Sequence, residues 1–144
     1  MADTKIVKKD NDAVEENKTV VTPQKVGRFK MSSGVLYVQA TYNNTKVLLT
    51  DKKGNAVTAS SSGALGFKGA KKGTPFAAAK VGELIGDRAK LMGVSEVDVV
   101  VSGVGAGRES SIRAFSSKGI GLSSITDKTP VPHNGPKPKK PRRV

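Results

Sequence analysis

The run from Glu96 to Ser102 (EVDVVVS) is the most apolar segment of the chain, and it constrains the fold more than any other. Four of its seven residues are valines, and Gly93 and Gly103 lie on either side of it. A short apolar, β-branched run between glycines is typical of a strand in the middle of a sheet. Because such a sheet must be covered, helices are expected to pack on it.

Three further strands are expected before this run, at residues 34–42, 45–50 and 55–60. They are rich in β-branched and apolar residues. Asn43 and Asn44 interrupt the first pair, and residues 51–54 (DKKG) have the composition of a second turn. The pattern predicts an antiparallel meander of three strands.

A helix is expected between this meander and the apolar run. Thr74 and Pro75 are the residue types of an N-cap and a first helical position, and Gly93 ends the segment. Gly82 and Gly86 lie four positions apart within it. Since glycine weakens a helix, their presence predicts close packing of this helix on the sheet.

Two more elements complete the predicted fold. A second helix is expected at residues 110–118, before Gly119, and a short strand at 120–126. The order β-β-β-α-β-α-β predicts an α/β fold with a mixed sheet, antiparallel at first and parallel where helices cross over. The sequence leaves both a two-layer and a three-layer arrangement open.

Charge and proline divide the chain into three parts. Residues 126–144 hold five of the seven prolines and six basic residues against one acid, so they cannot build a core. Residues 1–25 carry five lysines and five acids without a helical or strand-like apolar pattern. We expect a disordered, charged N-terminal extension at 1–25, an α/β domain at 26–126 and an extended basic C-terminal tail at 127–144.

The charge indicates nucleic acid as the partner. The net charge is +13, and residues 1–25 sum to zero, so the whole excess lies in the rest of the chain. A basic excess concentrated in a tail is the usual electrostatic footprint of a protein that neutralises phosphates. A soluble protein with a merely basic surface is the alternative.

Composition argues against several other classes of protein. The chain has no cysteine and one histidine, His133, which excludes a disulfide framework, a thiolate nucleophile and a cluster of histidine ligands. It has no apolar run of membrane-spanning length and no secretory signal at its start. We therefore expect a cytoplasmic protein that does not bind membranes.

A glycine-containing loop, Gly103–Gly107 (GVGAG), follows the apolar run. It is similar to the start of a dinucleotide-binding loop, but Arg108 stands in place of the third glycine. Since no GxxxxGKS/T motif occurs either, no cofactor and no small-molecule substrate is expected. The loop can still present backbone N–H groups to an anion, and Arg108 and Arg113 can bond to phosphate. A tight turn is the structural alternative.

A second glycine-rich stretch, residues 60–73, holds four glycines and the lysines Lys68, Lys71 and Lys72. Glycine lets a backbone come close to a partner, and lysine supplies charge for a phosphate. The six aromatic residues are scattered, and most are expected in the core. This favours recognition of RNA shape and phosphates over stacking on bases.

Four carboxylates leave one enzymatic alternative open. A two-metal nuclease needs acids that the fold brings together, and the candidates are Asp51, Asp98, Glu109 and Asp127. Asp51 lies in a turn beside two lysines, and Asp127 adjoins Lys128. Structural roles are therefore expected, with no catalytic residue and no metal site.

Several ordered motifs resemble those of one protein family. They are Tyr42–Thr45 (YNNT), Thr50-Asp51 with Gly54-Asn55, Ser61–Gly63 (SSG), Gly66–Gly69 (GFKG), Thr74-Pro75, Gly103–Glu109 (GVGAGRE), Ile112–Ala114 (IRA), Thr129–Gly135 (TPVPHNG) and Arg142–Val144 (RRV). On these residues the chain, from about Gly34 to Val144, resembles the bacterial members of the S-eleven family of small-subunit ribosomal proteins. Pro136 stands where the tail of that family usually has cysteine, yet the charge and extension of the tail are kept.

The resemblance implies a ribonuclease-H-like fold without nuclease activity and a structural role on the platform of the small ribosomal subunit. It implies binding to 16S rRNA, contact with neighbouring small-subunit proteins, help in assembly and a part in the mRNA exit-site cleft used in translation. The expected RNA-binding residues are Asn43, Asn44, Lys68, Lys71, Lys72, Arg108, Arg113, His133, Asn134, Lys137, Lys139, Lys140, Arg142 and Arg143. A nonspecific RNA-binding or nucleoid-binding chaperone is the alternative.

Overall fold

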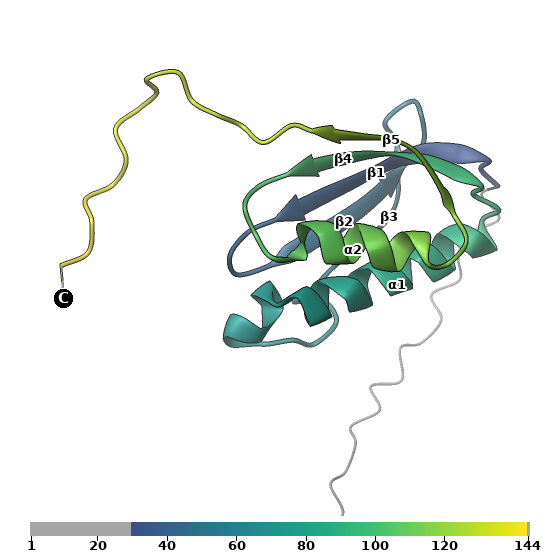
Figure 1. Ribbon diagram of the computed structural model, residues 1–144, viewed down its shortest axis with the longest axis horizontal. Helices are drawn as coiled ribbons and strands as arrows, with labels where there is room; N and C mark the ends of the chain where they lie inside the picture. The colour runs from purple at the N-terminus through teal and green to yellow at the C-terminus, as the bar shows by residue number, and fades with distance from the viewer. Residues whose placement is uncertain (1–29, 144) are drawn as a thin grey trace, which may run out of the picture.

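Five strands form one mixed sheet in the spatial order β3-β2-β1-β4-β5, and two helices pack against it (Figure 1). The computed structural model describes residues 30–143, so the extension expected at residues 1–25 lies outside the described part. The elements are β1 (Ser33–Ala40), β2 (Thr45–Thr50), β3 (Ala56–Ser61), the 3₁₀ turn η1 (Gly69–Gly73), α1 (Pro75–Leu91), β4 (Glu96–Ser102), α2 (Gly107–Ser116) and β5 (Gly121–Asp127). Their order and the mixed sheet confirm the predicted α/β fold.

Strand directions follow from the connections. Tight turns join β1, β2 and β3, which pair antiparallel. Each of the strands that follow a helix pairs in parallel, β4 with β1 and β5 with β4. The apolar run is therefore an interior strand, as predicted, and Val97, Val99 and Val101 are buried.

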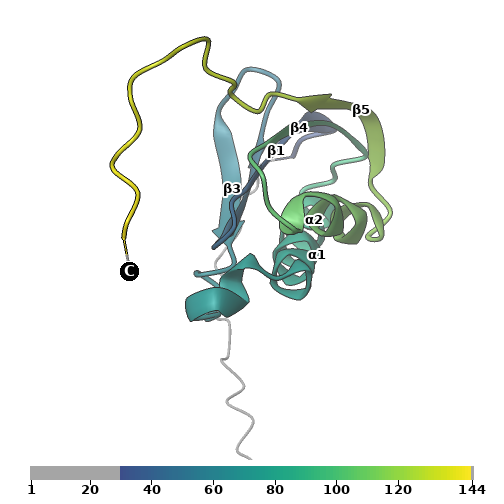
Figure 2. The same ribbon diagram turned by 60° about the vertical axis from the view of Figure 1, so that its left-hand side comes forward.

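Both helices cover the same face of the sheet (Figure 2). Leu36, Val38 and Ala40 of β1 are buried, whereas Tyr37 and Gln39 between them are exposed. Such alternation is typical of a sheet that is covered on one side. Of the two arrangements that the sequence leaves open, the described part of the chain adopts the two-layer one.

The core lies between the helices and the sheet. Its largest buried side chains are Phe115 of α2, Ile85 of α1, and Leu36 and Leu49 of the sheet. Burial of a side chain of this size stabilises the fold by about 1.5–3 kcal/mol. The core therefore holds both helices on the sheet and places the loops that lead into them.

The two helices approach each other through glycines of α1. A Cβ atom at Gly82 would collide with the carbonyl oxygen of Ser111 in α2, and one at Gly86 would lie 2.7 Å from the Lys118 side chain. The prediction that these glycines pack on the sheet is wrong. They allow close packing of α1 on α2 and on the residues that follow it.

The start of α1 agrees with the sequence. The Thr74 side chain accepts a hydrogen bond from the backbone N–H of Ala77 (3.3 Å), and Pro75 is the first helical residue. Among residues 30–143, neither helix is both long and apolar enough to span a membrane.

The start of α2 differs from the sequence. The helix begins at Gly107, inside the glycine run, and its N-cap residue Ala106 makes no side-chain cap bond. Gly107 is buried where a Cβ atom would collide with the Thr45 hydroxyl and lie 2.7 Å from the Ala78 side chain. The start of α2 therefore coincides with tertiary packing of Gly107 and not with a capping residue. For this reason the local sequence did not predict where the helix begins.

Candidate nucleic-acid interface

The connections that carry predicted RNA-binding residues, or that lead directly into them, lie at one end of the domain, here named the loop end. It comprises the β1–β2 turn (residues 41–44), the lysine loop before α1 (62–74), the glycine loop before α2 (103–107) and the base of the tail (128–129) (Figure 1). The cause is topological, because β1, β4 and β5 are parallel and their carboxyl ends share one edge of the sheet. Open α/β sheets generally bind ligands at this edge.

The β1–β2 turn lies between the lysine loop and the glycine loop. A Cβ atom at Gly73 of the lysine loop would collide with the carbonyl oxygen of Tyr42. A Cβ atom at Gly105 of the glycine loop would lie 2.5 Å from the carbonyl oxygen of Thr41. Glycine thus brings both loops against the turn, and the three segments form one continuous surface.

Hydrogen bonds within the turn fix its shape. The Thr41 backbone N–H donates to the Asn44 carbonyl oxygen (2.8 Å), and the Asn44 backbone N–H donates to the Thr41 hydroxyl (3.1 Å). Tyr42 and Asn43 at the tip are exposed, whereas Asn44 is half-buried. Of the two asparagines expected to contact RNA, Asn43 is the more accessible.

The lysine loop carries positive charge that has no acidic partner within residues 30–143. Lys68 and Lys71 are exposed, and Lys72 is half-buried beside Gly63. Among the described residues, none of the three lysines forms an ion pair. Within this part of the chain, no acid competes with a phosphate for their charges.

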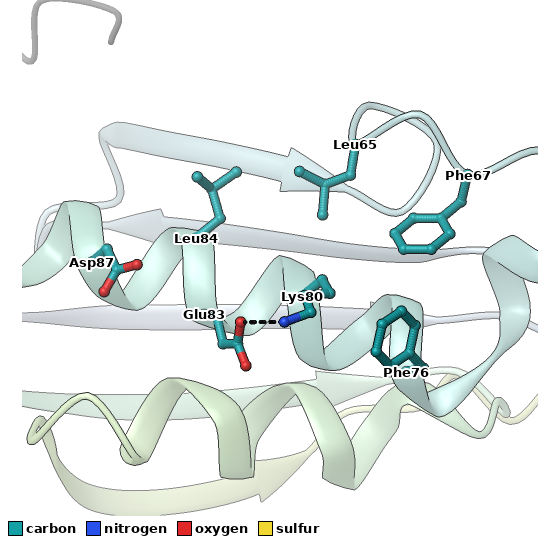
Figure 3. A pocket seen from close by; sticks show the side chains of 7 residues that line it. All are labelled: Leu65, Phe67, Phe76, Lys80, Glu83, Leu84 and Asp87. Atoms are coloured by element: carbon teal, nitrogen blue, oxygen red, sulfur yellow. Dashed lines mark hydrogen bonds and ion pairs between the residues drawn. The ribbon is translucent and has the colours of Figure 1, made fainter. Parts of the chain in front are cut away.

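An aromatic pair holds the lysine loop against α1 (Figure 3). The rings of Phe67 in the loop and Phe76 in α1 are arranged edge to face, with centroids 6.1 Å apart. The Lys80 ammonium lies 5.6 Å from the Phe76 centroid and 3.0 Å from the Glu83 carboxylate. Leu65, Leu84 and Asp87 complete the lining of this open groove of about 480 Å³. The contact between Phe67 and Phe76 thus links the lysine loop to the first turn of α1.

Arg108, by contrast, is engaged within the protein. Its Nη1 donates to the Gly103 carbonyl oxygen (2.5 Å), and its Nη2 donates to a carboxylate oxygen of Asp127 (2.5 Å). Hydrogen bonds from the side chain and backbone of Thr129, and then from Arg108, lower the pKa of Asp127 to about 2. Asp127 is therefore charged at neutral pH and pairs with the guanidinium as a carboxylate.

Arg113 remains accessible on α2. It pairs with Glu109 across one helical turn, and the two side chains are 77% and 78% exposed. Water screens such a pair, so its contribution to stability is small. Arg113 can therefore exchange this partner for a phosphate more readily than Arg108 can.

The tail leaves the loop end and extends away from the domain (Figure 1). Residues 130–143 are exposed and contain no helix or strand. They include the predicted contacts His133, Asn134, Lys137, Lys139, Lys140, Arg142 and Arg143. The structure thus gathers the turn, the lysine loop and the tail base, and leaves the far part of the tail separate from them.

The sequence did not predict the specific roles of three residues at this end, Tyr42, Asp127 and Thr129. Tyr42 is 79% exposed, and among the described aromatic residues only Phe115 is fully buried, so the expectation of mostly buried rings is wrong. The position of Tyr42 in a tight turn was an available signal, because turn tips are exposed. Asp127 and Thr129 gave no such signal, since Asp127 meets its arginine partner 19 positions away.

The carboxylates considered for a metal site have separate structural partners. Asp51 accepts hydrogen bonds from the side chain and backbone of Asn55 (2.8 Å each), which lower its pKa. Asp98 accepts from the Ser124 hydroxyl (2.7 Å), and the other two candidates pair with arginines. Within residues 30–143, no group of three or more Asp, Glu, His or Cys side chains is placed to hold a metal ion.

The sequence matches known proteins over most of its length. Residues 34–143 match the family model described as Ribosomal protein S11. The chain is also similar to Small ribosomal subunit protein uS11 of Leptothrix cholodnii, with 50% identity over 117 residues that cover 81% of this chain and 87% of that protein. The matched range includes both helices, nearly the whole sheet and the tail as far as Arg143. The chain therefore belongs to the ribosomal protein S11 family.

Proposed function

We propose that this protein binds 16S rRNA on the platform of the small ribosomal subunit through its loop end and its tail. Its family membership supports a structural role in the small subunit, and with it rRNA binding and translation. The S11 family is not a known family of enzymes. The observation that carries the finer proposal is that the turn, the lysine loop and the tail base lie at one end of the domain.

Electrostatics supports this choice of surface. The lysine loop offers three lysines without an acidic partner among the described residues, and residues 137–143 of the tail add five basic side chains. Each cation that comes close to a phosphate releases condensed counterions, so binding is strongest at low salt. Phosphate contacts of this kind fix the orientation of a protein on its RNA.

The backbone of the lysine loop can also approach RNA closely. Gly66 and Gly69 have φ values of 94° and 62°, and no described atom lies within 4 Å of a Cβ built at either position. Loops with glycine in this conformation, followed by a helix N-terminus, can direct backbone N–H groups at an anion. Recognition then depends on RNA shape and phosphate position, as is usual for folded RNA.

Tyr42 adds an aromatic surface to the same end. Its side chain is largely exposed, and its carbonyl oxygen lies against Gly73, next to Lys72 of the lysine loop. An exposed ring at the tip of a turn that packs against the lysine loop is suited to stacking on an unpaired base, a contact worth about 1–3 kcal/mol. We therefore add Tyr42 to the proposed RNA contacts.

The tail becomes ordered when it binds. Its like charges repel one another in the free protein, whereas rRNA phosphates neutralise them and repay the loss of chain entropy. In this way the tail can link rRNA segments during assembly and take part in the mRNA exit-site cleft, beside neighbouring small-subunit proteins. The proposed location is the ribosome.

A salt series of binding measurements tests this function. The ligands are an rRNA fragment of the small-subunit platform and a DNA duplex of equal length. The proteins are the full chain and a tail-neutral variant, in which Lys137, Lys139, Lys140, Arg142 and Arg143 are replaced by glutamine. We expect a preference for the RNA, and a slope of log K against log salt that falls by about 0.7–0.9 for each phosphate that the altered tail no longer neutralises.

Two results would contradict the proposal. Equal affinity for duplex DNA would support a nonspecific RNA-binding or nucleoid-binding chaperone instead. An unchanged slope in the tail-neutral variant would remove the tail from the RNA-binding surface.

A further inference from the structure

Hydrogen bonds from three segments hold the junction between β5 and the tail. The Lys128 backbone N–H donates to the Val101 carbonyl oxygen of β4 (2.8 Å), so pairing with β4 continues one residue past β5. The Thr129 hydroxyl donates to the Asp127 carboxylate (2.6 Å) and accepts from the Gly103 backbone N–H (3.2 Å). The chain at Thr129 is thereby tied to β4, to β5 and to the glycine loop.

Arg108 lies at the centre of these contacts. Its Nη1 donates to the Gly103 carbonyl oxygen (2.5 Å) and to the Thr129 hydroxyl (3.3 Å), and its Nη2 donates to Asp127 (2.5 Å). Both terminal nitrogens are in use, and the side chain is only 33% exposed. A hydrogen bond between charged groups is roughly twice as strong as a neutral one, so a phosphate would have to displace a good partner.

We infer that Arg108, Asp127 and Thr129 form a clamp that sets the direction in which the basic tail leaves the domain. Arg108 is a positioning residue for the tail and not itself a phosphate contact, which differs from the role that its place in the sequence predicts. The inference rests on the proposed function, because it takes the tail to be an rRNA-binding segment.

A fixed direction matters because the first residues of the tail are stiff. Pro130 and Pro132 restrict φ, so the residues next to the clamp keep an extended course. The basic residues at 137–143 are then presented on one side of the domain, at a raised effective concentration for the RNA that the loop end binds. Loss of the clamp would let the tail sample a larger volume and would weaken its binding.

Arg113 provides a matched control. It lies on the same helix and carries the same charge, but its ion pair with Glu109 lies within α2. Replacement of Arg113 removes one positive charge from the surface and leaves the contacts of Arg108 in place. The two arginines therefore separate the effect of charge from the effect of the clamp.

The test is a double-mutant cycle in the full chain. Arg108→Gln is combined with the tail-neutral variant, and the affinity of each protein for the platform rRNA fragment is measured. We expect Arg108→Gln to weaken binding on the order of tenfold when the tail is basic, and by less than about twofold when the tail is neutral. Arg113→Gln should weaken binding by the same factor in both backgrounds. An equal effect of Arg108→Gln in both backgrounds would overturn the clamp, because a direct phosphate contact behaves in that way.

A second measurement needs no RNA. In the free full chain, ¹⁵N relaxation reports the backbone order of residues 128 and 129 on the picosecond to nanosecond timescale. Arg108→Gln and Asp127→Asn should each lower this order toward that of residues 137–143, whereas Arg113→Gln should leave it unchanged. Unchanged order in both clamp variants would overturn the inference. If the order falls but no protein prefers the rRNA fragment to duplex DNA, the clamp stands and the proposed function fails.

Discussion

The two loops that precede the helices are both rich in glycine, and each has basic residues within it or directly after it, yet these basic residues differ in their partners. The lysine loop holds Lys68, Lys71 and Lys72 without an acidic partner among the described residues, whereas the arginine that follows the glycine loop is bound by Asp127. The sheet causes the difference. β5 ends in Asp127 beside the glycine loop, while β3 ends in Ser61 and brings no acid to the lysine loop. A basic residue in such a loop is thus available to RNA only where the fold supplies no acid.

The largest expected effect follows from a change in the glycine loop. Gly103 has a φ of 92°, and a Cβ atom there would collide with the Ala40 carbonyl oxygen. Gly103→Ala should lower the free energy of unfolding by about 3 kcal/mol or more, because left-handed strain and overpacking add together. Gly66 in the lysine loop has a similar φ of 94° but open space around it. We therefore expect Gly66→Ala to lower the free energy of unfolding by about 1 kcal/mol. Urea unfolding measures both values, and equal losses would mean that the glycine loop is not the more tightly packed of the two.

Neutralising the lysine loop should have the next largest effect. The triple variant Lys68→Gln, Lys71→Gln and Lys72→Gln should bind the platform rRNA fragment roughly a hundredfold more weakly at about 0.1 M salt, with a salt slope lower by about 2. The reason is that these lysines have no acidic partner in the described structure, so their full charge is available to phosphates. The urea midpoint should not change, since none of the three is part of the core.

The control for this variant removes three exposed lysines from the opposite end of the domain. Lys52 and Lys53 lie in the β2–β3 turn, and Lys90 lies in the last turn of α1. Their replacement by glutamine removes the same charge and should change affinity and slope much less. If both triple variants bind equally weakly, binding depends on net charge and not on the loop end.

Tyr42 tests whether the surface beside the lysine loop reads more than phosphates. Tyr42→Ala should weaken binding to the rRNA fragment about tenfold, or about 1.4 kcal/mol, because one base loses its stacking partner. Tyr42→Phe keeps the ring and should bind the rRNA fragment with the affinity of the wild-type protein. Equal losses in the two variants would instead show that the hydroxyl group makes the contact.

Most of the fold could be predicted because its elements are marked locally. β2 and β4 have the predicted bounds, since each is an apolar run between turn residues. The number of layers could not be predicted, because Val100 makes β4 resemble a strand that is buried on both faces. In the structure Val100 is only half-buried, on the face that the helices leave open.

The candidate site could be predicted only in part, for a related reason. Asn43 and Lys68 lie in a turn and a glycine-rich loop, and both features are visible in a few neighbouring residues. Whether the charge of Arg108 is paired depends on Asp127. Asp127 lies close to Arg108 because β4 and β5 pair in parallel and end at the same edge of the sheet. The sequence shows that a residue is basic, but only the fold shows whether its charge is already paired.

The smallest expected effect is a pH dependence of the clamp. The pKa of Asp127 is lowered from 3.8 to about 2, first by hydrogen bonds from Thr129 and then by Arg108. A carboxyl group whose pKa falls on folding stabilises the folded state above its unfolded pKa, and this contribution is lost as the pH falls to the folded value. The difference in free energy of unfolding between the wild-type protein and the Asp127→Asn variant should therefore not depend on pH around neutrality, and it should shrink between about pH 4 and 2. Urea unfolding across this range measures it, and a difference that does not shrink would mean that the charge of Asp127 does not hold the clamp.

A variant of Asp51 distinguishes the effect of the clamp from the acid sensitivity that any carboxyl group with a lowered pKa causes. Its pKa is also lowered, by hydrogen bonds from Asn55 in the β2–β3 turn at the opposite end of the sheet. Asp51→Asn should show the same sign of pH dependence, because the cause is of the same kind. It should leave the backbone order of residues 128 and 129 unchanged at every pH, whereas Asp127→Asn lowers that order even at neutral pH. If Asp51→Asn also loosens the tail base, the order there reflects the stability of the whole domain and not the contacts of Arg108.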